Sequence, residues 1–258
     1  MTSHTVLSRE ACKSDIVVHL ADARLETPGD LEKGYAINNA AISALAEGIA
    51  GTDKKLILTS GTGFTAADPD GNETDEGSPS WPDSPFGSGM ETLVPELKKK
   101  GINVNMVRLA PWVYGRGGSG VKLLMDGAAR AGVVTYVEPG TKCTTTVHVD
   151  DAARLYLLVA QKAAAGEIYN ASSETNVTFR QLAEAMGAML NVPVLGMSYD
   201  ELEGKVGTFF AKFLSTENRA SNAKAQKDLD WRIEAEKGII DEIASGSYVE
   251  VAQALRKA

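Results

Sequence analysis

The sequence predicts an α/β protein in which helices flank a parallel β-sheet. Two short apolar runs, Ile16–Ala21 and Lys55–Ser60, have the length and composition of strands buried on both faces of such a sheet. Between them, apolar residues recur at helical spacing from Ile37 to Ile49. A strand, a helix and a second strand in this order predict a βαβ unit, whose crossover is right-handed.

The next segments repeat this pattern. Apolar spacing predicts a helix over 90–100, and Asn103–Leu109 has the composition of a third strand. The stretch Gly61–Gly89, between the second strand and this helix, is rich in Gly, Pro, Ser and Asp and predicts a long loop. Loops of this length are uncommon inside a compact domain, so we expect this one to border a functional site.

The second half of the chain predicts shorter elements. They are a helix over 120–131, a strand over 133–137, a helix to Ala164 capped by Asp150 or Asp151, a strand over 168–171, and a helix over 180–190 capped by Thr178. After Tyr199 the pattern is mostly helical. We therefore expect a sheet-bearing part, 1–165, interleaved with a small, mostly helical part, 166–258, the two forming one compact unit.

Composition narrows the function classes. The 258 residues carry 26 Lys+Arg and 34 Asp+Glu, and the basic residues are scattered, so nucleic acid is not an expected partner. No window comes near the roughly 18 uncharged apolar residues of a membrane span. The opening residues also lack the apolar centre of a signal peptide, so we expect a cytoplasmic protein without membrane contact. Two isolated cysteines and three histidines predict neither a disulfide framework nor a metal site.

Five segments in order carry a resemblance to a known family. They are DIVVHLA (Asp15–Ala21), LILTSGTG (Leu56–Gly63), RLAPWVYGRGG (Arg108–Gly118), TVHVDDAARLYLLVA (Thr146–Ala160) and IYNASSETNVTFRQLAEAM (Ile168–Met186). Together they resemble the extended and atypical short-chain dehydrogenase/reductases, the NAD-dependent epimerase/dehydratase family. The resemblance implies a Rossmann-like sheet with a C-terminal substrate region. It also implies NAD or NADP as cofactor and oxidoreductase or epimerase activity on a carbonyl or hydroxyl group of a small molecule.

The sequence departs from that family at its start. Family members begin with a strand and a GxxGxxG turn, whose glycines let the pyrophosphate approach a helix N-terminus, but no such turn occurs here. Ile16–Ala21 resembles the family's fourth strand, so we expect an incomplete Rossmann-like sheet with this strand at its edge. An exposed apolar edge strand can pair with a strand of another chain. We expect the N-terminal helix or a partner chain to cover it, as in a homodimer, or nothing to cover it because the gene model is truncated. Binding of NAD(P) is expected to be weak or absent.

The family's proton-transfer pair is missing as well. A Tyr, with a Lys four residues later, passes a proton to or from the substrate oxygen in the family. Between Tyr35 and Tyr114 there is no Tyr, and at the equivalent positions Phe86 and Met90 cannot move a proton. Ser60 resembles the serine of the family's catalytic set. Its hydroxyl could bind a substrate oxygen, or the residue could only form the turn after the strand.

The resemblance predicts further site residues, and for several of them a purely structural role is the alternative. Tyr114 and His148 join Ser60 as catalytic candidates, although Tyr114 could only pack its ring and His148 could only shape the junction before the next helix. The cofactor-facing candidates are His19, Leu20, Ala21, Thr59 and Pro111, of which His19 is equally readable as a core histidine. The substrate candidates are Thr62, Trp81, Phe86 and Arg108, of which Arg108 is also a candidate for a structural ion pair.

Three functions stay open at this point. The first is the family activity, an NAD(P)-dependent oxidoreductase or epimerase. The second is a cofactor-independent isomerase, lyase or cyclase on the same scaffold, and the third is a non-catalytic relic that binds a ligand. The sequence names no substrate and does not choose between NAD and NADP.

Overall fold

A computed structural model describes residues 3–23, 31–82 and 90–257, which form two compact units. Unit 1 contains Met1–Ser60, Gly87–Arg108 and Leu155–Tyr169, and unit 2 contains Gly61–Phe86, Leu109–Arg154 and Asn170–Ala258. The predicted parts, 1–165 and 166–258, are continuous in sequence, whereas each unit collects three separated segments. The chain therefore leaves and re-enters each unit, and its two halves are interleaved.

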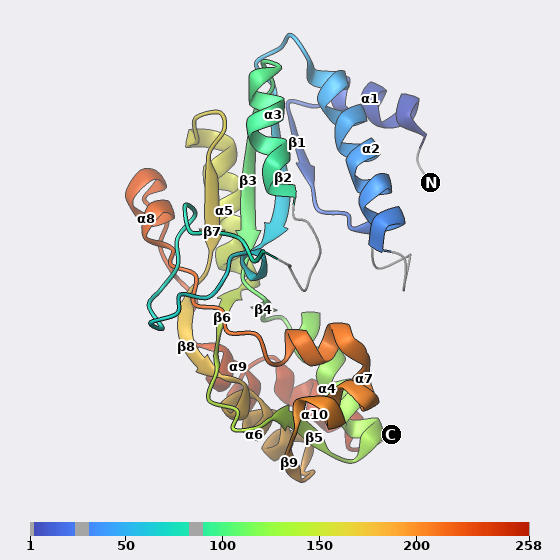
Figure 1. The fold of residues 1–258 in the computed structure, drawn as a ribbon, viewed down its shortest axis with the longest axis vertical. Helices are drawn as coiled ribbons and strands as arrows, with labels where there is room; N and C mark the ends of the chain where they lie inside the picture. Colours follow the sequence, from blue (N-terminus) through green and yellow to red (C-terminus); the bar gives the residue numbers. More distant parts are fainter. Residues whose placement is uncertain (1–2, 24–30, 83–89, 258) are drawn as a thin grey trace. The chain divides into compact units, whose positions relative to one another are not determined.

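The centre of unit 1 is a four-stranded sheet (Figure 1). Its order is β1 (Ile16–His19), β2 (Lys55–Gly61), β3 (Asn103–Leu109) and β7 (Ile168–Ala171). β1 and β2 are parallel, with Ile16 opposite Lys55 and His19 opposite Leu58. These strands agree with the apolar runs of the sequence, and the α/β fold with a parallel Rossmann-like sheet flanked by helices is confirmed.

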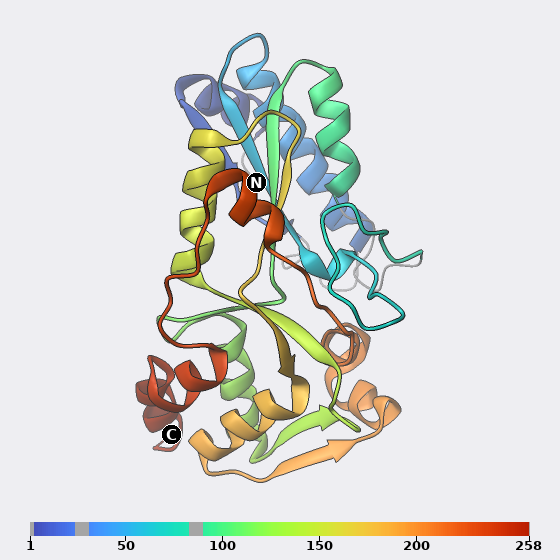
Figure 2. The ribbon, with the colours of Figure 1, turned by 90° about the vertical axis from the view of Figure 1, so that its left-hand side faces the viewer.

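Helices cover the two faces of this sheet. Figure 2 shows α5 (Val149–Lys162) on one face, and α2 (Leu31–Ile49) and α3 (Leu93–Lys99) on the other. A short helix, η3 (Met90–Thr92), leads into α3, and Met90 packs against the core between these helices and the sheet. The Nζ of Lys55 donates to the carbonyls of Val159 and Ala163, at 2.7 and 2.9 Å, and so ties the end of α5 to β2.

The N-terminal helix α1 (His4–Lys13) packs against α2. Gly48 permits this approach, because a Cβ at this position would lie 2.9 Å from the Cβ of Ala11 and still closer to the carbonyl oxygen of Ser8. Ala11 is buried in the same core as α2 and α3, and Val17 of β1 packs against that core. One face of β1 is therefore covered.

The other face of β1 is not covered by any element that the structure describes. Ile16 and Val18 are each 42% exposed, and Leu20, just after the strand, is 64% exposed. The prediction that this strand is buried on both faces is wrong. The physical reason is its place in the sheet: β1 lies at the edge, with β2 as its neighbour among the described strands, and α5 lies over the inner strands. β1 is thus an edge strand, as predicted. The N-terminal helix α1 packs on the same face as α2 and leaves the other face of β1 exposed.

Unit 2 contains two smaller sheets. In the first, β4 (Trp112–Tyr114) pairs in parallel with β6 (Cys143–His148), which pairs antiparallel with β8 (Glu174–Thr178). In the second, β5 (Val134–Val137) pairs in parallel with β9 (Val194–Met197). The C-terminal region is therefore less purely helical than predicted, because β8 and β9 are only five and four residues long and lack an apolar alternation that the sequence would reveal.

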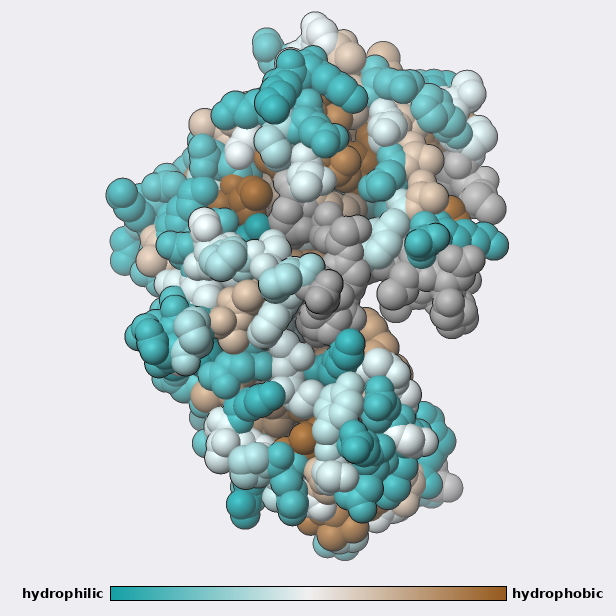
Figure 3. Space-filling view, in the orientation of Figure 1, coloured by the Kyte–Doolittle hydropathy of each residue, from teal (hydrophilic) through white to brown (hydrophobic). Residues whose placement is uncertain are grey.

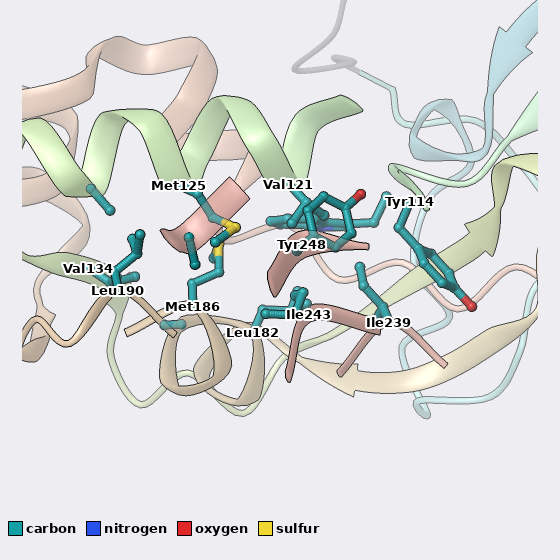
Figure 4. Packing of buried hydrophobic residues seen from close by; sticks show 14 of the residues in the cluster. Tyr114, Val121, Met125, Val134, Leu182, Met186, Leu190, Ile239, Ile243 and Tyr248 are labelled. Carbon is teal, nitrogen blue, oxygen red and sulfur yellow. The ribbon is translucent and has the colours of Figure 1, made fainter. Parts of the chain in front are cut away.

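Six helices lie wholly in unit 2 in the described part of the chain. They are α4 (Ser119–Ala131), α6 (Phe179–Leu190), α7 (Tyr199–Phe213), α8 (Ala223–Leu229), α9 (Ile239–Ser245) and α10 (Tyr248–Leu255), and a short helix η2 (Thr62–Phe64) follows β2. The predicted cap of α6 is confirmed, because Thr178 and Gln181 form a capping box. Figure 4 shows buried side chains of α4, α6, α9 and α10 pointing toward one another.

The face drawn in Figure 3 is largely hydrophilic, with small hydrophobic areas. Among the described residues, no helix has the length and apolarity that a membrane span requires, and no three His, Cys, Asp or Glu side chains form a group suited to a metal.

Candidate functional site

In unit 1 the predicted residues meet at the carboxyl ends of the strands. β1, β2 and β3 run in the same direction, so their last residues lie at the same end of the sheet (Figure 1). This end of the sheet holds His19 from β1, Thr59 and Ser60 from β2, and Arg108 from β3. In open parallel sheets, ligands bind outside the carboxyl ends of the strands. The position is therefore the one where a binding site is expected in this fold.

A pair of hydroxyl groups is the best defined feature of this end of the sheet. The Oγ1 of Thr59 lies 2.7 Å from the hydroxyl of Tyr156, which comes from α5. Burial raises the pKa of Tyr156 to about 12, so its phenol stays protonated at neutral pH. Sequence reasoning missed Tyr156. The available signal was a single polar-tipped side chain on the apolar face of the helix that contains LYLLVA.

His19 is buried at the end of β1. Its Nδ1 has no hydrogen-bond partner among the described residues, and burial lowers the pKa of the imidazole, which favours the neutral form. The segment that follows is held by α2: Asn38 accepts from the amide of Ala23 at 2.9 Å and donates to Oδ1 of Asp22 at 3.0 Å. The burial fits the core reading of His19, and its contact with a cofactor stays a prediction.

The remaining candidates of unit 1 differ in exposure. Leu20 and Ala21 are exposed after β1, Ser60 is half-buried, and Arg108 is buried. Their predicted roles toward cofactor and substrate stay predictions, because position and burial alone do not assign chemistry.

In unit 2, the catalytic candidates Tyr114 and His148 lie side by side. Tyr114 ends β4 and lies opposite His148 of β6, and the two rings meet edge to face with centroids 5.3 Å apart. The hydroxyl of Tyr114 donates to the carbonyl of Lys237 at 2.9 Å, and burial is the main cause that raises its pKa. In this structure the phenol is thus engaged by the backbone, and its action on a substrate stays a prediction.

His148 is tightly enclosed. Its Nδ1 accepts from the amide of Asp150 at 3.2 Å, in the first turn of α5. On the opposite side of the ring, a Cβ at Gly115 would lie 2.3 Å from Nε2, and Gly115 has φ of +106°. The expectation that Asp150 or Asp151 caps this helix is wrong, because α5 begins at Val149 and the His148 ring takes the capping role.

The two aspartates of α5 have different tasks. Asp150 pairs with Arg116 at 2.8 Å on the surface. Asp151 is fully buried and accepts from the amides of Glu234 and Ala235, at 2.9 and 3.3 Å. Its carboxylate thereby fixes the segment after Trp231, whose indole donates to the Asp151 carbonyl at 3.0 Å. Trp231 is itself buried.

A tyrosine that the sequence did not single out holds the loop after β4. The hydroxyl of Tyr248 accepts from the amide of Gly115 and donates to the carbonyl of Gly118, each at 2.9 Å. Three successive residues of this loop, Gly115 to Gly117, have positive φ. Because such a backbone is unfavourable for most residues, external hydrogen bonds from α10 stabilise it.

The other candidate residues of unit 2 differ in their burial and hydrogen bonds. Thr62 is fully buried; its hydroxyl donates to Oδ1 of Asn218 at 2.9 Å, and its carbonyl accepts from Nδ2 of Asn218 at 2.9 Å. Trp81 is half-buried, and its amide donates to the carbonyl of Phe64 at 3.2 Å. Pro111 lies half-buried in the bend between β3 and β4. Phe86 lies outside the residues that the structure describes. Substrate and cofactor roles at these positions stay predictions.

Curated relatives match most of the chain. The uncharacterized protein C2A9.02 of Schizosaccharomyces pombe is 32% identical over 210 residues, which are 80% of this chain and 69% of that protein. The uncharacterized protein YLL056C of Saccharomyces cerevisiae is 30% identical over 233 residues, which are 88% of this chain and 75% of that protein.

Solved structures agree in fold. The dTDP-glucose 4,6-dehydratase DesIV of Streptomyces venezuelae, with NAD and TYD bound, has a TM-score of 0.76 at 19% identity, covering 99% of this chain and 78% of its own. The UDP-glucose 4-epimerase of Thermotoga maritima, with UDP-glucose, has a TM-score of 0.74 at 21% identity, covering 98% and 82%. At these identities the likeness concerns the fold.

The family assignment rests on the sequence model of the NAD dependent epimerase/dehydratase family, which matches residues 2–172. This range includes the sheet of unit 1, the β4–β6 pair and α5. The chain belongs to the NAD-dependent epimerase/dehydratase family.

Proposed function

We propose that this chain transforms a small molecule at a carbonyl or hydroxyl carbon. Its family membership supports this class of reaction, and the observation that carries it is the pair of hydroxyl groups of Thr59 and Tyr156 at the carboxyl ends of the strands, where ligands bind in this fold. Ser60, the next residue of β2, carries a third hydroxyl group at the same end of the strand, on its other face. Hydroxyl groups there can donate hydrogen bonds to a substrate oxygen and accept one from a substrate hydroxyl.

The three hydroxyls have different parts in this proposal. Ser60 is the group that contacts the substrate oxygen. Tyr156 is a positioning residue for Thr59, because its phenol is bonded to the Thr59 hydroxyl at 2.7 Å and stays protonated with a pKa of about 12. A donor held in place before the substrate arrives stabilises developing charge without reorganising during the reaction.

The described residues are poorly suited to bind the NAD or NADP that the family implies. A dinucleotide needs backbone amides and close-packed glycines for its pyrophosphate. Leu20–Ala23, the described residues after β1, contain no glycine and include Asp22, whose carboxylate lies 3.0 Å from the Asn38 amide nitrogen. The sequence also holds no GxxGxxG turn. These residues do not fit the pyrophosphate of NAD or NADP, so weak or absent binding is the expectation.

Turnover by the whole chain tests the proposal. The folded protein would be incubated with a panel of aldehydes, ketones and secondary alcohols, with and without NADH or NADPH, and products followed by mass spectrometry. For any substrate found, we expect Ser60→Ala to lower kcat/KM by about 100-fold. Tyr156→Phe should have a smaller effect, and Tyr199→Phe, at the start of α7, is the matched control with no effect. The absence of turnover across the panel by a folded chain would overturn the proposal.

A calorimetric titration with NADH and NADPH separates the remaining alternatives. Low-micromolar binding together with nucleotide-dependent turnover would favour the oxidoreductase or epimerase of the family. Turnover without nucleotide would favour a cofactor-independent isomerase, lyase or cyclase. A chain that binds panel compounds without converting them would be a ligand-binding relic, which contradicts the proposed catalysis.

A further inference from the structure

A cavity of about 600 Å3 lies within unit 2, between α4, β5, α6 and α7. All of its lining residues belong to this unit. Figure 4 shows three of them, Val134, Leu182 and Met186, among the buried apolar side chains of the core. Pockets that enclose small organic ligands have volumes of this order and mostly apolar walls. The inner wall of this cavity is therefore suited to the apolar part of a ligand.

The wall formed by α4 is a narrow apolar strip. Leu123, Gly127 and Ala131 line the cavity at intervals of four residues, so they lie on the same face of the helix. Leu123 is 55% exposed, and no neighbouring atom lies within 4 Å of the place where a Cβ of Gly127 would be. This strip therefore has room beside it. Exposed apolar surface next to a buried apolar wall favours an elongated apolar partner.

The wall formed by α7 is also exposed. Gly207 interrupts this helix, with φ of 81° and ψ of 161°, a conformation that is open to glycine and strained for other residues. Val206 and Phe210, which line the cavity on either side of the interruption, are 39% and 36% exposed. Because lining residues of both α4 and α7 reach the surface, the cavity opens to solvent on this side.

A single cation stands at this opening. Lys205 is the one charged residue among the lining residues that the structure describes, and it is exposed. Glu201, one helical turn earlier, attracts it but is bonded to the amide and hydroxyl of Ser198, at 2.9 and 2.8 Å, and forms no ion pair with it. A lysine stem can follow apolar surface while its ammonium stays in water. One negative headgroup on an apolar tail matches this arrangement.

We propose that this cavity binds a straight-chain amphiphile with a single negative charge, such as a fatty acid. Its carboxylate lies at Lys205, in contact with water, and its hydrocarbon chain lies along α4 between Leu123 and Ala131. This strip is about 12 Å long, at a rise of about 1.5 Å per residue. An extended decanoate chain has a similar length. The site does not depend on the catalysis proposed for the strand ends, and binding can be measured without turnover.

Chain length tests the apolar part of the proposal. Isothermal titration calorimetry of the full chain would compare hexanoate, octanoate and decanoate, each present as monomers in solution. Each pair of added methylene groups should tighten binding by about tenfold, the gain expected when both groups are buried. An affinity that does not rise along this series would overturn the proposal.

Variants of Lys205 test the headgroup. Lys205→Met keeps a long apolar stem without the charge and should weaken decanoate binding about threefold, the loss expected for one exposed ion pair, while leaving 1-decanol unchanged. Lys205→Glu should bind decyltrimethylammonium more tightly than decanoate, the reverse of the wild-type order. Lys212→Met, in the last turn of α7, is the matched control, because Lys212 does not line the cavity. It should leave the affinities for all three compounds unchanged.

A blocking variant and its matched control locate the site. Because Gly127 lines the cavity and has open space beside it, Gly127→Leu can enter the cavity without a backbone clash. It should lower the affinity for decanoate and 1-decanol by about tenfold or more, since the space they need is filled. Gly120, also in α4, is equally open but does not line the cavity, so Gly120→Leu should leave both affinities unchanged.

Other results would also overturn the proposal. They are the absence of decanoate binding by the folded wild-type chain, or an unchanged decanoate affinity in a folded Gly127→Leu or Lys205→Met chain. Attachment to phosphatidylglycerol vesicles without binding of monomeric decanoate would instead assign the exposed apolar residues to a lipid surface. Circular dichroism and thermal unfolding establish that each variant is folded. Should Gly127→Leu fail to fold, Ala131→Phe at the exposed end of α4 blocks the same cavity, and the same criteria apply.

Discussion

Tyrosines of the two units use their hydroxyl groups in different ways. In unit 2, Tyr114 donates to the Lys237 carbonyl and Tyr248 bonds the backbone of Gly115 and Gly118. In unit 1, Tyr156 bonds another side chain, Thr59, at the end of a strand. A hydroxyl bonded to the backbone keeps a loop in place, whereas a hydroxyl bonded to another side chain orients that side chain. The comparison separates groups that hold the backbone from groups that orient side chains, which is the role proposed for Tyr156.

The loop after β4 should show the largest effect of a single change. Gly115→Ala places a Cβ against Nε2 of His148 at a residue with φ of +106°. We expect the free energy of unfolding to fall by about 3 kcal/mol or more. Urea unfolding followed by circular dichroism measures it. Gly120→Ala in α4 is the control and should gain up to about 1 kcal/mol from helix propensity. Equal stability of both variants would contradict the role given to Gly115.

Adjacent aspartates of α5 give the next contrast. Asp151→Ala leaves the amides of Glu234 and Ala235 without their buried acceptor and should lower the free energy of unfolding by about 3 kcal/mol. Asp150→Ala removes a surface pair with Arg116 and should change it by less than about 1 kcal/mol. Chemical unfolding of the two variants compares them directly. A similar loss in both would mean that burial does not distinguish these carboxylates.

Removing single hydroxyls tests the comparison itself. Tyr248→Phe breaks two bonds to the backbone and should cost about 2 kcal/mol, whereas Tyr156→Phe breaks one and should cost about 1 kcal/mol. The same unfolding assay applies. A larger loss for Tyr156→Phe would place it with the groups that hold the backbone and weaken its proposed role in orienting Thr59.

The stability that Tyr156 contributes should depend on pH in the alkaline range. Its pKa is raised by burial from 10.0 to about 12, so the folded state favours the protonated phenol. A raised pKa adds stability that is complete below the unfolded value and is lost as pH rises through the folded value. We expect the stability difference between wild type and Tyr156→Phe to narrow between about pH 10 and 12. Urea unfolding at pH 8, 10 and 11 follows it, and a constant difference would contradict the assigned cause.

The exposed face of β1 should give the smallest change in monomer stability. Val18 is 42% exposed, so Val18→Lys should alter the free energy of unfolding by less than about 0.5 kcal/mol. Pairing of two copies through this edge remains a prediction of the sequence. If it occurs, the added charge should convert a dimer to a monomer in light scattering. A wild-type chain that is already monomeric would remove the homodimer from consideration.

Much of the fold could be predicted because its signals are local. β3 and β7 have the predicted bounds, and α4 begins within one residue of its prediction. Thr178 caps α6 as predicted, and Gln181 completes the capping box. An apolar run, a helical period and a cap each depend on neighbours in the chain, so the amino-acid order by itself determined these elements and, with the five family segments, the α/β class and the family.

The tertiary structure decided which groups meet. Tyr156 and Thr59 are 97 residues apart, and Tyr114 and Lys237 are 123 apart, so no local pattern predicts either hydrogen bond. The exposed face of β1 also depended on its place in the sheet, because the apolar sequence of that strand is the same whether or not a helix covers it. Burial, hydrogen-bond partners and the cavity of unit 2 arise from packing between distant segments, which only the folded chain brings together.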